Sequence, residues 1–135
     1  MRYLFIAEKP SLMRTVRSCY NNHKAEVISR VGEIDFVAMA GHLCTNYMPD
    51  DYEDSPWSGL HWDEVTYPMV PQQWGIKPIE NPRSKKLLHE ISQKASSYEG
   101  FIVGTDSDME GYGIYFLLEN FLHLTEKKAL RFMER

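Results

Sequence analysis

Apolar residues fall into short continuous runs and into helically spaced stripes along this chain. The runs at residues 3–7 and 101–103 predict strands buried on both faces of a parallel sheet, because they contain no alternating polar positions. Residues 12–20, 85–95 and 114–124 have the length and apolar content of helices. We therefore expect an α/β fold, with a mostly parallel central sheet flanked by helices.

Three further segments have the character of strands. Residues 26–31 and 35–40 are predicted to be two strands around Gly32-Glu33, joined as a hairpin or by a tight connection. Residues 129–133 are expected to form a last strand. The central sheet should then contain about four strands.

Residues 46–82 interrupt this pattern. Six prolines break any long element there, while tyrosines and three tryptophans supply apolar surface. A long excursion with little regular structure is either a functional loop or a disordered one. The tryptophans favour packing, because disordered segments are poor in aromatic residues.

Composition narrows the class of protein. A chain of 135 residues with 43% hydrophobic content suits a single domain, residues 1–135, with one core. Cys19 and Cys44 lack the spacing of a zinc site or a disulfide framework. The first residues enter a strand without a signal-peptide apolar region, and no run approaches a membrane span, so we expect a cytoplasmic protein that does not enter a membrane.

Net charge gives a weaker indication. The value of -4 lacks the overall basic character that advertises nucleic-acid binding. A carboxylate metal site lowers the net charge by itself, so this net charge does not exclude a local basic face that binds nucleic acid.

Candidate chemistry is concentrated after the strand at residues 101–103. Asp106, Asp108 and Glu110 follow at alternate positions, at the end of a strand where open α/β sheets place their ligands. Such hard oxygen ligands suit Mg²⁺ or Mn²⁺. The alternative is a solvated acidic turn that favours a helix N-terminus. An EF-hand is excluded, because Leu117 stands where its closing glutamate belongs.

The first strand ends in a comparable way. Glu8-Lys9-Pro10-Ser11 follows it directly, and Ser11 is expected to cap the next helix. The chain therefore contains two strand, acid and helix units. It contains neither of the glycine-rich nucleotide-binding motifs GxxxxGK[ST] and GxGxxG.

These two motifs resemble those of the TOPRIM domain, which type IA topoisomerases, bacterial-type primases and certain nucleases share. The match is strongest to the N-terminal domain of bacterial topoisomerase III. Gly41-His42-Leu43 and the stretch at residues 67–74 resemble further markers of that group, in the same order along the chain. The resemblance implies a TOPRIM, Rossmann-like fold with the Pro- and Trp-rich residues 46–82 as an insertion.

The resemblance also implies roles for individual residues. Glu8 is similar to the glutamate that acts as general acid or base at the scissile phosphate, and Lys9 to the lysine that offers it positive charge. Asp106 and Asp108, with Glu110 in support, are similar to the Mg²⁺ ligands. The residues alone leave another arrangement open, in which Glu8 is a third metal ligand and Lys9 its ion-pair partner.

Lys9, Ser11 and His42 are the expected DNA or phosphate contacts, although a loop histidine is more often a structural hydrogen-bonding residue. Two positions depart from the resembled motif. Met109 stands where an arginine is usual, and Tyr112 where another acid is usual. The arginine would supply a cation that binds phosphate or orients the acids.

The implied function is that of the TOPRIM domain of a topoisomerase III-like type IA DNA topoisomerase. It would provide the Mg²⁺ site for cleavage and religation of single-stranded DNA, with a nucleophilic tyrosine from a remaining domain. None of the eight tyrosines here has the setting of an activated nucleophile, so we do not expect the isolated chain to relax DNA. The alternatives are a free-standing Mg²⁺-dependent nuclease or primase-like phosphotransferase, and a non-catalytic DNA-binding module.

Overall fold

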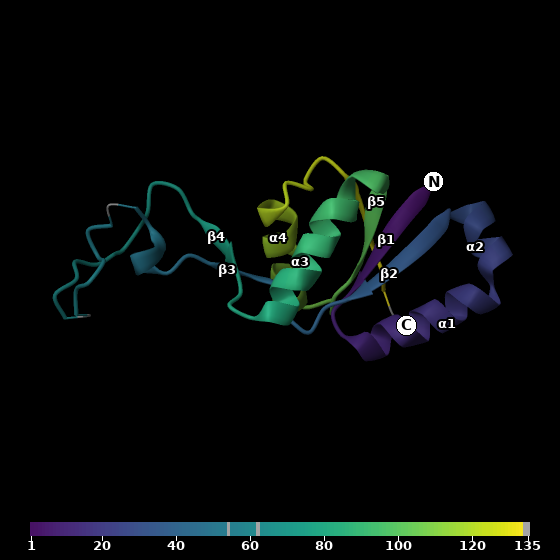
Figure 1. The fold of residues 1–135 in the computed structure, drawn as a ribbon, viewed down its shortest axis with the longest axis horizontal. Coiled ribbons are helices and arrows are strands. Elements are labelled where there is room, and N and C mark those ends of the chain that lie inside the picture. The colour runs from purple at the N-terminus through teal and green to yellow at the C-terminus, as the bar shows by residue number, and fades with distance from the viewer. Residues whose placement is uncertain (54, 62, 134–135) are drawn as a thin grey trace.

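A four-stranded parallel sheet organises the computed structural model, which describes residues 1–53, 55–61 and 63–133. Its strands are β1 (Arg2–Ala7), β2 (Glu33–Ala38), β5 (Gly100–Gly104) and β6 (Lys128–Arg131), in the spatial order β2-β1-β5-β6 (Figure 1). Every neighbouring pair is parallel. The predicted sheet is thus confirmed, and the two strands with continuous apolar runs, β1 and β5, are its central ones.

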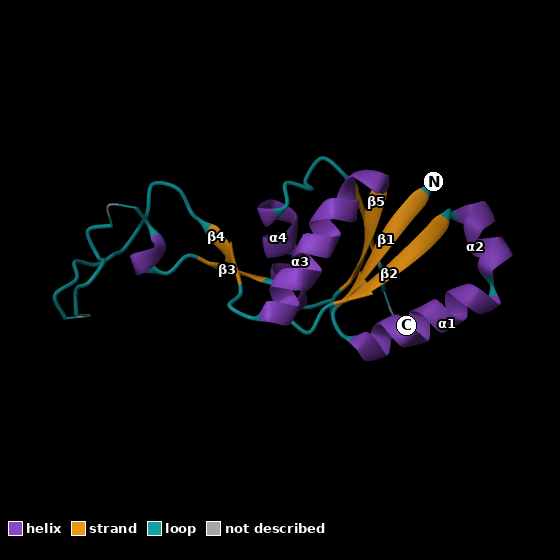
Figure 2. Ribbon diagram, in the orientation of Figure 1, coloured by secondary structure: helices purple, strands orange, loops and turns teal. Residues whose placement is uncertain are grey.

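Helices cover both faces of this sheet (Figure 2). They are α1 (Pro10–Asn22), α2 (Lys24–Arg30), α3 (Pro82–Lys94) and α4 (Met109–Phe121), with one-turn 3₁₀ helices at η1 (Pro49–Asp51) and η2 (Ala95–Ser97). No helix in the described part of the chain is long and apolar enough to cross a membrane.

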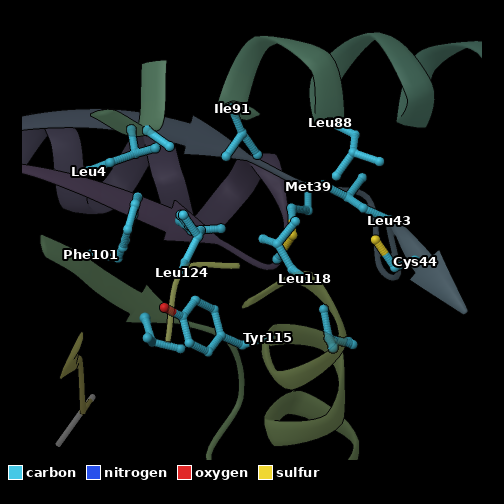
Figure 3. Close-up of a cluster of buried hydrophobic side chains, with 14 of the residues drawn as sticks. Leu4, Met39, Leu43, Cys44, Leu88, Ile91, Phe101, Tyr115, Leu118 and Leu124 are labelled. Atoms are coloured by element: carbon cyan, nitrogen blue, oxygen red, sulfur yellow. The ribbon is translucent and has the colours of Figure 1, made fainter. Parts of the chain in front are cut away.

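Alternate residues of β1 pack against different helices. Leu4 belongs to a buried cluster with Ile91 of α3 and Leu118 of α4 (Figure 3). Phe5 faces the other way, where its ring lies 5.5 Å from that of Phe36, which in turn lies 5.5 Å from Tyr20 of α1. Because successive strand residues point to opposite faces, both faces of the central strands are buried. This burial explains why the sequence of these strands is apolar throughout.

The strand predicted at residues 26–31 is wrong, because α2 occupies this segment. Ile28 and Val31 are exposed there and Val27 is only half-buried, so the segment lacks the continuous buried residues of a strand within a sheet. An ion pair of 3.0 Å joins Glu26 to Arg30 one helical turn later. The parallel pairing of β1 with β2 also requires a crossover connection, which α1 and α2 form together.

The remaining predicted elements are confirmed, with shifted ends. Helix α3 begins three residues early because the Asn81 side chain accepts hydrogen bonds from the backbone N–H groups of Arg83 and Ser84, at 2.9 and 3.4 Å. Strand β6 ends at Arg131, before residue 133.

The excursion at residues 46–82 extends away from the sheet (Figure 1). Its base is an antiparallel pair of short strands, β3 (Cys44–Asn46) and β4 (Ile76–Pro78). Tyr52 contacts the rings of Tyr47 and Trp57, with ring centroids 5.1 and 6.4 Å apart, so aromatic packing is present as predicted. Trp74, however, is 71% exposed, and Trp62 lies outside the described residues.

Candidate functional site

The two acidic loops leave the same edge of the sheet. Ala7, the last residue of β1, pairs with Gly104, the last residue of β5. The backbone N–H of Glu8 donates to the Gly104 carbonyl oxygen at 3.3 Å. The loop after β1 and the loop after β5, which are far apart in sequence, are therefore in direct contact.

The carboxyl groups of these loops interact. Partial burial is the largest cause that raises the pKa of Glu8 above its usual value. A hydrogen bond that protonated Glu8 donates to Asp106, and the negative charges of Asp106 and Asp108, raise this pKa further. Glu110 lies in the first turn of α4 and is exposed.

The carboxylates suit an open metal site better than a closed cage. Among the described residues, no group of three or more His, Cys, Asp or Glu side chains is arranged to hold a metal ion. Mg²⁺ is usually bound through one or two carboxylates, with waters and substrate phosphates completing its coordination. The hard oxygens of Asp106 and Asp108, beside Glu8, fit such a partial set of ligands.

The first turn of α4 fixes the loop that carries the aspartates. The Asp108 side chain accepts a hydrogen bond from the Gly111 backbone N–H at 2.6 Å and so caps the helix, which is why α4 begins well before the predicted residue 114. Gly111 packs against the Asp106 backbone, because a Cβ at this position would overlap the carbonyl oxygen of Asp106 and lie 2.8 Å from its carbonyl carbon. A side chain at residue 111 would displace the acidic loop.

Arg131 is a residue of this region that the sequence did not indicate. Its guanidinium donates to the Thr105 hydroxyl oxygen at 2.9 Å, to the Thr105 carbonyl oxygen, and to the Ser107 hydroxyl oxygen at 3.2 Å. The sequence placed Arg131 inside its last predicted strand. Its contact with the acidic loop could not be inferred without knowing that β6 pairs with β5, which sequence spacing does not reveal.

Lys9 and Ser11 lie at the start of α1, and both are exposed. The predicted cap by Ser11 is wrong, because Lys9 occupies the capping position without a side-chain hydrogen bond and Pro10 begins the helix. Lys9 makes no ion pair among the described residues, so the arrangement in which it pairs with Glu8 is absent there.

The loop after β2 reaches the same edge. The Gly41 backbone N–H donates to the Glu8 carbonyl oxygen at 3.3 Å, which brings half-buried His42 into this neighbourhood. Of the two positions that depart from the expected motif, Met109 is 88% exposed and Tyr112 is 64% exposed. The Tyr112 ring stacks on that of Phe116, with centroids 6.0 Å apart.

Comparison with known families decides what kind of domain carries this site. The sequence model of the Toprim domain matches residues 3–134. This chain belongs to the Toprim domain family. The α/β structure with its parallel four-stranded sheet is consistent with the Toprim fold.

Three relatives are DNA topoisomerases. The Toprim chain is similar to DNA topoisomerase 3 of Vibrio cholerae, with 33% identity over 82% of this chain and 17% of the relative. DNA topoisomerase 3 of Salmonella typhimurium is 30% identical over 93% of this chain and 19% of its own length. DNA topoisomerase 1 of Mycoplasma genitalium is 23% identical over 94% of this chain and 16% of its own length. This Toprim domain therefore spans less than a fifth of these relatives.

Proposed function

We propose that this Toprim domain supplies the acidic, Mg²⁺-dependent half of a topoisomerase III-like reaction centre. In this role it would act on single-stranded DNA together with a nucleophilic tyrosine from a remaining domain. The observation that carries the proposal is the meeting of two loops at one sheet edge, with Glu8 and Lys9 on one and Asp106 and Asp108 on the other. The similarity to DNA topoisomerase 3 supports the choice of substrate.

Phosphoryl transfer between DNA and a tyrosine needs cations for the phosphate oxygens and a proton for the departing oxygen. A bound Mg²⁺ would neutralise charge that develops on the phosphate. Asp106 and Asp108, with Glu110 in support, would hold the ion. Lys9 would add a point charge, which needs no bidentate geometry.

Glu8 is the proposed proton carrier. The tyrosine would first lose its phenolic proton to solvent; when the phenolate oxygen then bonds to phosphorus and the bond to the 3′ oxygen breaks, the Glu8 carboxyl would give its proton to that oxygen. Religation would return the proton to Glu8. Ser11, at the start of α1, and His42, in the loop after β2, are proposed to contact neighbouring phosphates.

Binding of a labelled thymidine oligonucleotide tests this proposal. We expect fluorescence anisotropy to show binding that Mg²⁺ strengthens and that EDTA weakens. The Asp106→Ala/Asp108→Ala variant should lose this dependence, and Lys9→Ala should bind roughly tenfold more weakly, equivalent to about 1.4 kcal/mol. Lys94→Ala is the control. The first turn of α3 lies near Ala38 and Met39, where β2 ends and its loop leads toward the site. Lys94 is an exposed lysine in the last turn of α3, at the opposite end of this helix.

The products of the same incubation separate the alternatives. Intact oligonucleotide with Mg²⁺-dependent binding agrees with a domain that lacks its tyrosine. Metal-dependent cleavage that Asp108→Ala abolishes would instead identify a nuclease or a primase-like phosphotransferase. Binding that neither Mg²⁺ nor Glu8→Ala affects would identify a non-catalytic DNA-binding module.

A domain graft tests the link to topoisomerases. Residues 3–134 would replace the matching segment of Vibrio cholerae DNA topoisomerase 3. We expect the graft to relax supercoiled plasmid and the same graft with Asp106→Ala/Asp108→Ala to be inactive. A folded graft that binds single-stranded DNA with Mg²⁺ but never relaxes plasmid would contradict the topoisomerase assignment.

A further inference from the structure

The acidic loop is joined to the last strand of the sheet by a single side chain. Arg131 lies directly opposite Val103 in the β5–β6 register, and the next residue, Phe132, donates its backbone N–H to the Val103 carbonyl oxygen at 3.0 Å. The position of the Arg131 backbone is therefore set by the sheet. From this position its guanidinium reaches Thr105 and Ser107, on either side of Asp106.

Two kinds of acceptor make this contact specific. Thr105 is 4% exposed, and Arg131 is the hydrogen-bond donor to its hydroxyl among the described residues. The same guanidinium bonds the Thr105 carbonyl and the Ser107 hydroxyl, so one planar group fixes both a buried and an exposed part of the loop. A lysine ammonium lacks the planar, forked arrangement of N–H donors of a guanidinium and could not hold three acceptors in the same geometry.

The contact leaves the carboxylates available. Arg131 forms no ion pair with Asp106 or Asp108 among the described residues, although it lies beside them. A guanidinium that neutralised these groups would compete with a cation for their oxygens. Bonding to neutral acceptors instead orders the loop without occupying the proposed metal ligands.

We infer that Arg131 is a positioning residue for the metal-binding loop, which it holds in its binding conformation. The expected effect of Arg131 on Mg²⁺ affinity rests on the proposed function, because it requires the proposed Mg²⁺ site. The effect of Arg131 on the order of the loop applies to the metal-free chain as well.

Charge and positioning make opposite predictions for Mg²⁺ affinity. If Arg131 acted only through its charge, Arg131→Gln would remove a repulsion and strengthen Mg²⁺ binding. Positioning predicts the reverse: partners that orient metal ligands typically change affinity by roughly 10- to 100-fold. We expect Arg131→Gln to weaken Mg²⁺ binding by that factor, and Arg131→Lys to weaken it as well although the charge is retained.

The test combines calorimetric Mg²⁺ titration with amide hydrogen exchange of the metal-free chain. We expect exchange at residues 105–108 to become at least about tenfold faster in Arg131→Gln, while amides of β1 keep their wild-type rates. Arg17→Gln is the matched control, an exposed arginine of α1 without an ion pair among the described residues. It should leave both measurements unchanged.

Unchanged or tighter Mg²⁺ binding in Arg131→Gln would overturn the inference. A wild type that binds no Mg²⁺ would contradict the proposed function, and the exchange rates would then decide the role of Arg131. Faster exchange confined to residues 105–108 would support the positioning role, and unchanged exchange would refute it.

Discussion

Two strand, loop and helix units meet at one edge of the sheet, and they differ in charge and burial. In the first, β1 leads through Glu8 and Lys9 into α1, a helix that contains two arginines and no acidic residue. In the second, β5 leads through Asp106 and Asp108 into α4, which contains two glutamates and no basic residue. The first unit thus presents mainly cations beside its glutamate, and the second presents carboxylates.

Burial separates the two helices further. Tyr20 is the one buried residue of α1, whereas α4 has four, including Ile114, Tyr115 and Leu118 in the main core. Asp108 caps α4 with its side chain, while Lys9 makes no such bond to α1. The same topology therefore holds the carboxylates on a packed, capped helix and leaves the cations on an exposed one. That division suits the proposed site, in which the metal ligands would be fixed and the phosphate contacts would follow a flexible strand of DNA.

The largest expected difference between the units lies in core stability. Leu118 of α4 is 0% exposed, so Leu118→Ala should lower the free energy of unfolding by about 2–5 kcal/mol. Val16→Ala, at a half-buried position of α1, should cost about 1 kcal/mol. Urea unfolding followed by circular dichroism measures both. Equal losses would mean that α4 is no more strongly packed than α1.

Thiol reactivity contrasts the same two environments. Cys19 is exposed on α1, whereas Cys44 is buried in the cluster that contains Leu118, and burial raises the pKa of Cys44 to about 11 from its usual 9.0. Near neutral pH the thiolate fraction of Cys44 should therefore be about 100-fold smaller than that of a thiol with the usual pKa, and buried Cys44 should react more slowly than exposed Cys19. A maleimide or disulfide reagent followed by mass spectrometry measures the two rates.

The raised pKa of Cys44 also has a consequence for stability. The folded chain retains the Cys44 proton at pH values where the unfolded chain has lost it, so this contribution is present below about pH 9 and lost as pH rises toward about 11. Unfolding in urea at pH 8 and pH 10, with Cys44→Ala as comparison, tests this sign. A Cys44 that reacts as fast as Cys19 in the folded chain would contradict both statements.

Capping separates the structural role of Asp108 from its proposed metal role. Asp108→Ala removes the bond to the Gly111 N–H and should destabilise the domain by about 1 kcal/mol. Asp108→Asn keeps an acceptor oxygen but loses the charge, so it should stay near wild-type stability and bind Mg²⁺ more weakly. Lys9→Ala, at the uncapped start of α1, should change stability by less than about 0.5 kcal/mol. Thermal unfolding without metal, followed by Mg²⁺ titration, distinguishes these cases. If Asp108→Asn binds Mg²⁺ as strongly as the wild type, Asp108 is not one of the Mg²⁺ ligands.

The smallest expected effect concerns the arginines of α1. Arg14 and Arg17 are exposed, and neither forms an ion pair among the described residues. If they contact DNA phosphates, the double alanine variant should reduce the salt dependence of single-strand binding, with a slope smaller by about 1.4. Anisotropy between low and moderate salt measures this slope. The same slope in the variant and the wild type would assign these arginines to a solvated helix face.

The parts of the fold that the sequence could predict are those that depend on local pattern. Continuous apolar runs located β1 and β5, and the acids directly after them located the edge where the loops meet. Residues 26–31 were wrongly predicted as a strand joined to the next by a hairpin or a tight connection, whereas β2 pairs in parallel with β1 and the crossover between them is helical. The early start of α4 depended on a side-chain cap by Asp108, a residue interpreted from the sequence as a metal ligand or as part of an acidic turn near a helix N-terminus, but not as the cap itself.

Contacts between distant segments could not be obtained from spacing. Arg131 reaches Thr105 because β6 is the neighbour of β5, and strand order is a property of the folded sheet. The contact between Glu8 and Asp106 could be anticipated in part, because both follow adjacent apolar strands. The structure was needed to show that Asp106 interacts with Glu8, whereas Lys9 forms no ion pair with Glu8 among the described residues.

Titration with Mg²⁺ and Mn²⁺ by calorimetry, on the wild type and on Asp106→Ala/Asp108→Ala, tests the central claim most directly. The proposed site predicts binding by the wild type that disappears in the double variant, with both proteins folded as judged by circular dichroism. Binding of equal strength in the variant would show that the aspartates are not the ligands. Absence of wild-type binding up to about 10 mM, a free energy weaker than roughly 3 kcal/mol, would contradict a metal site in this chain.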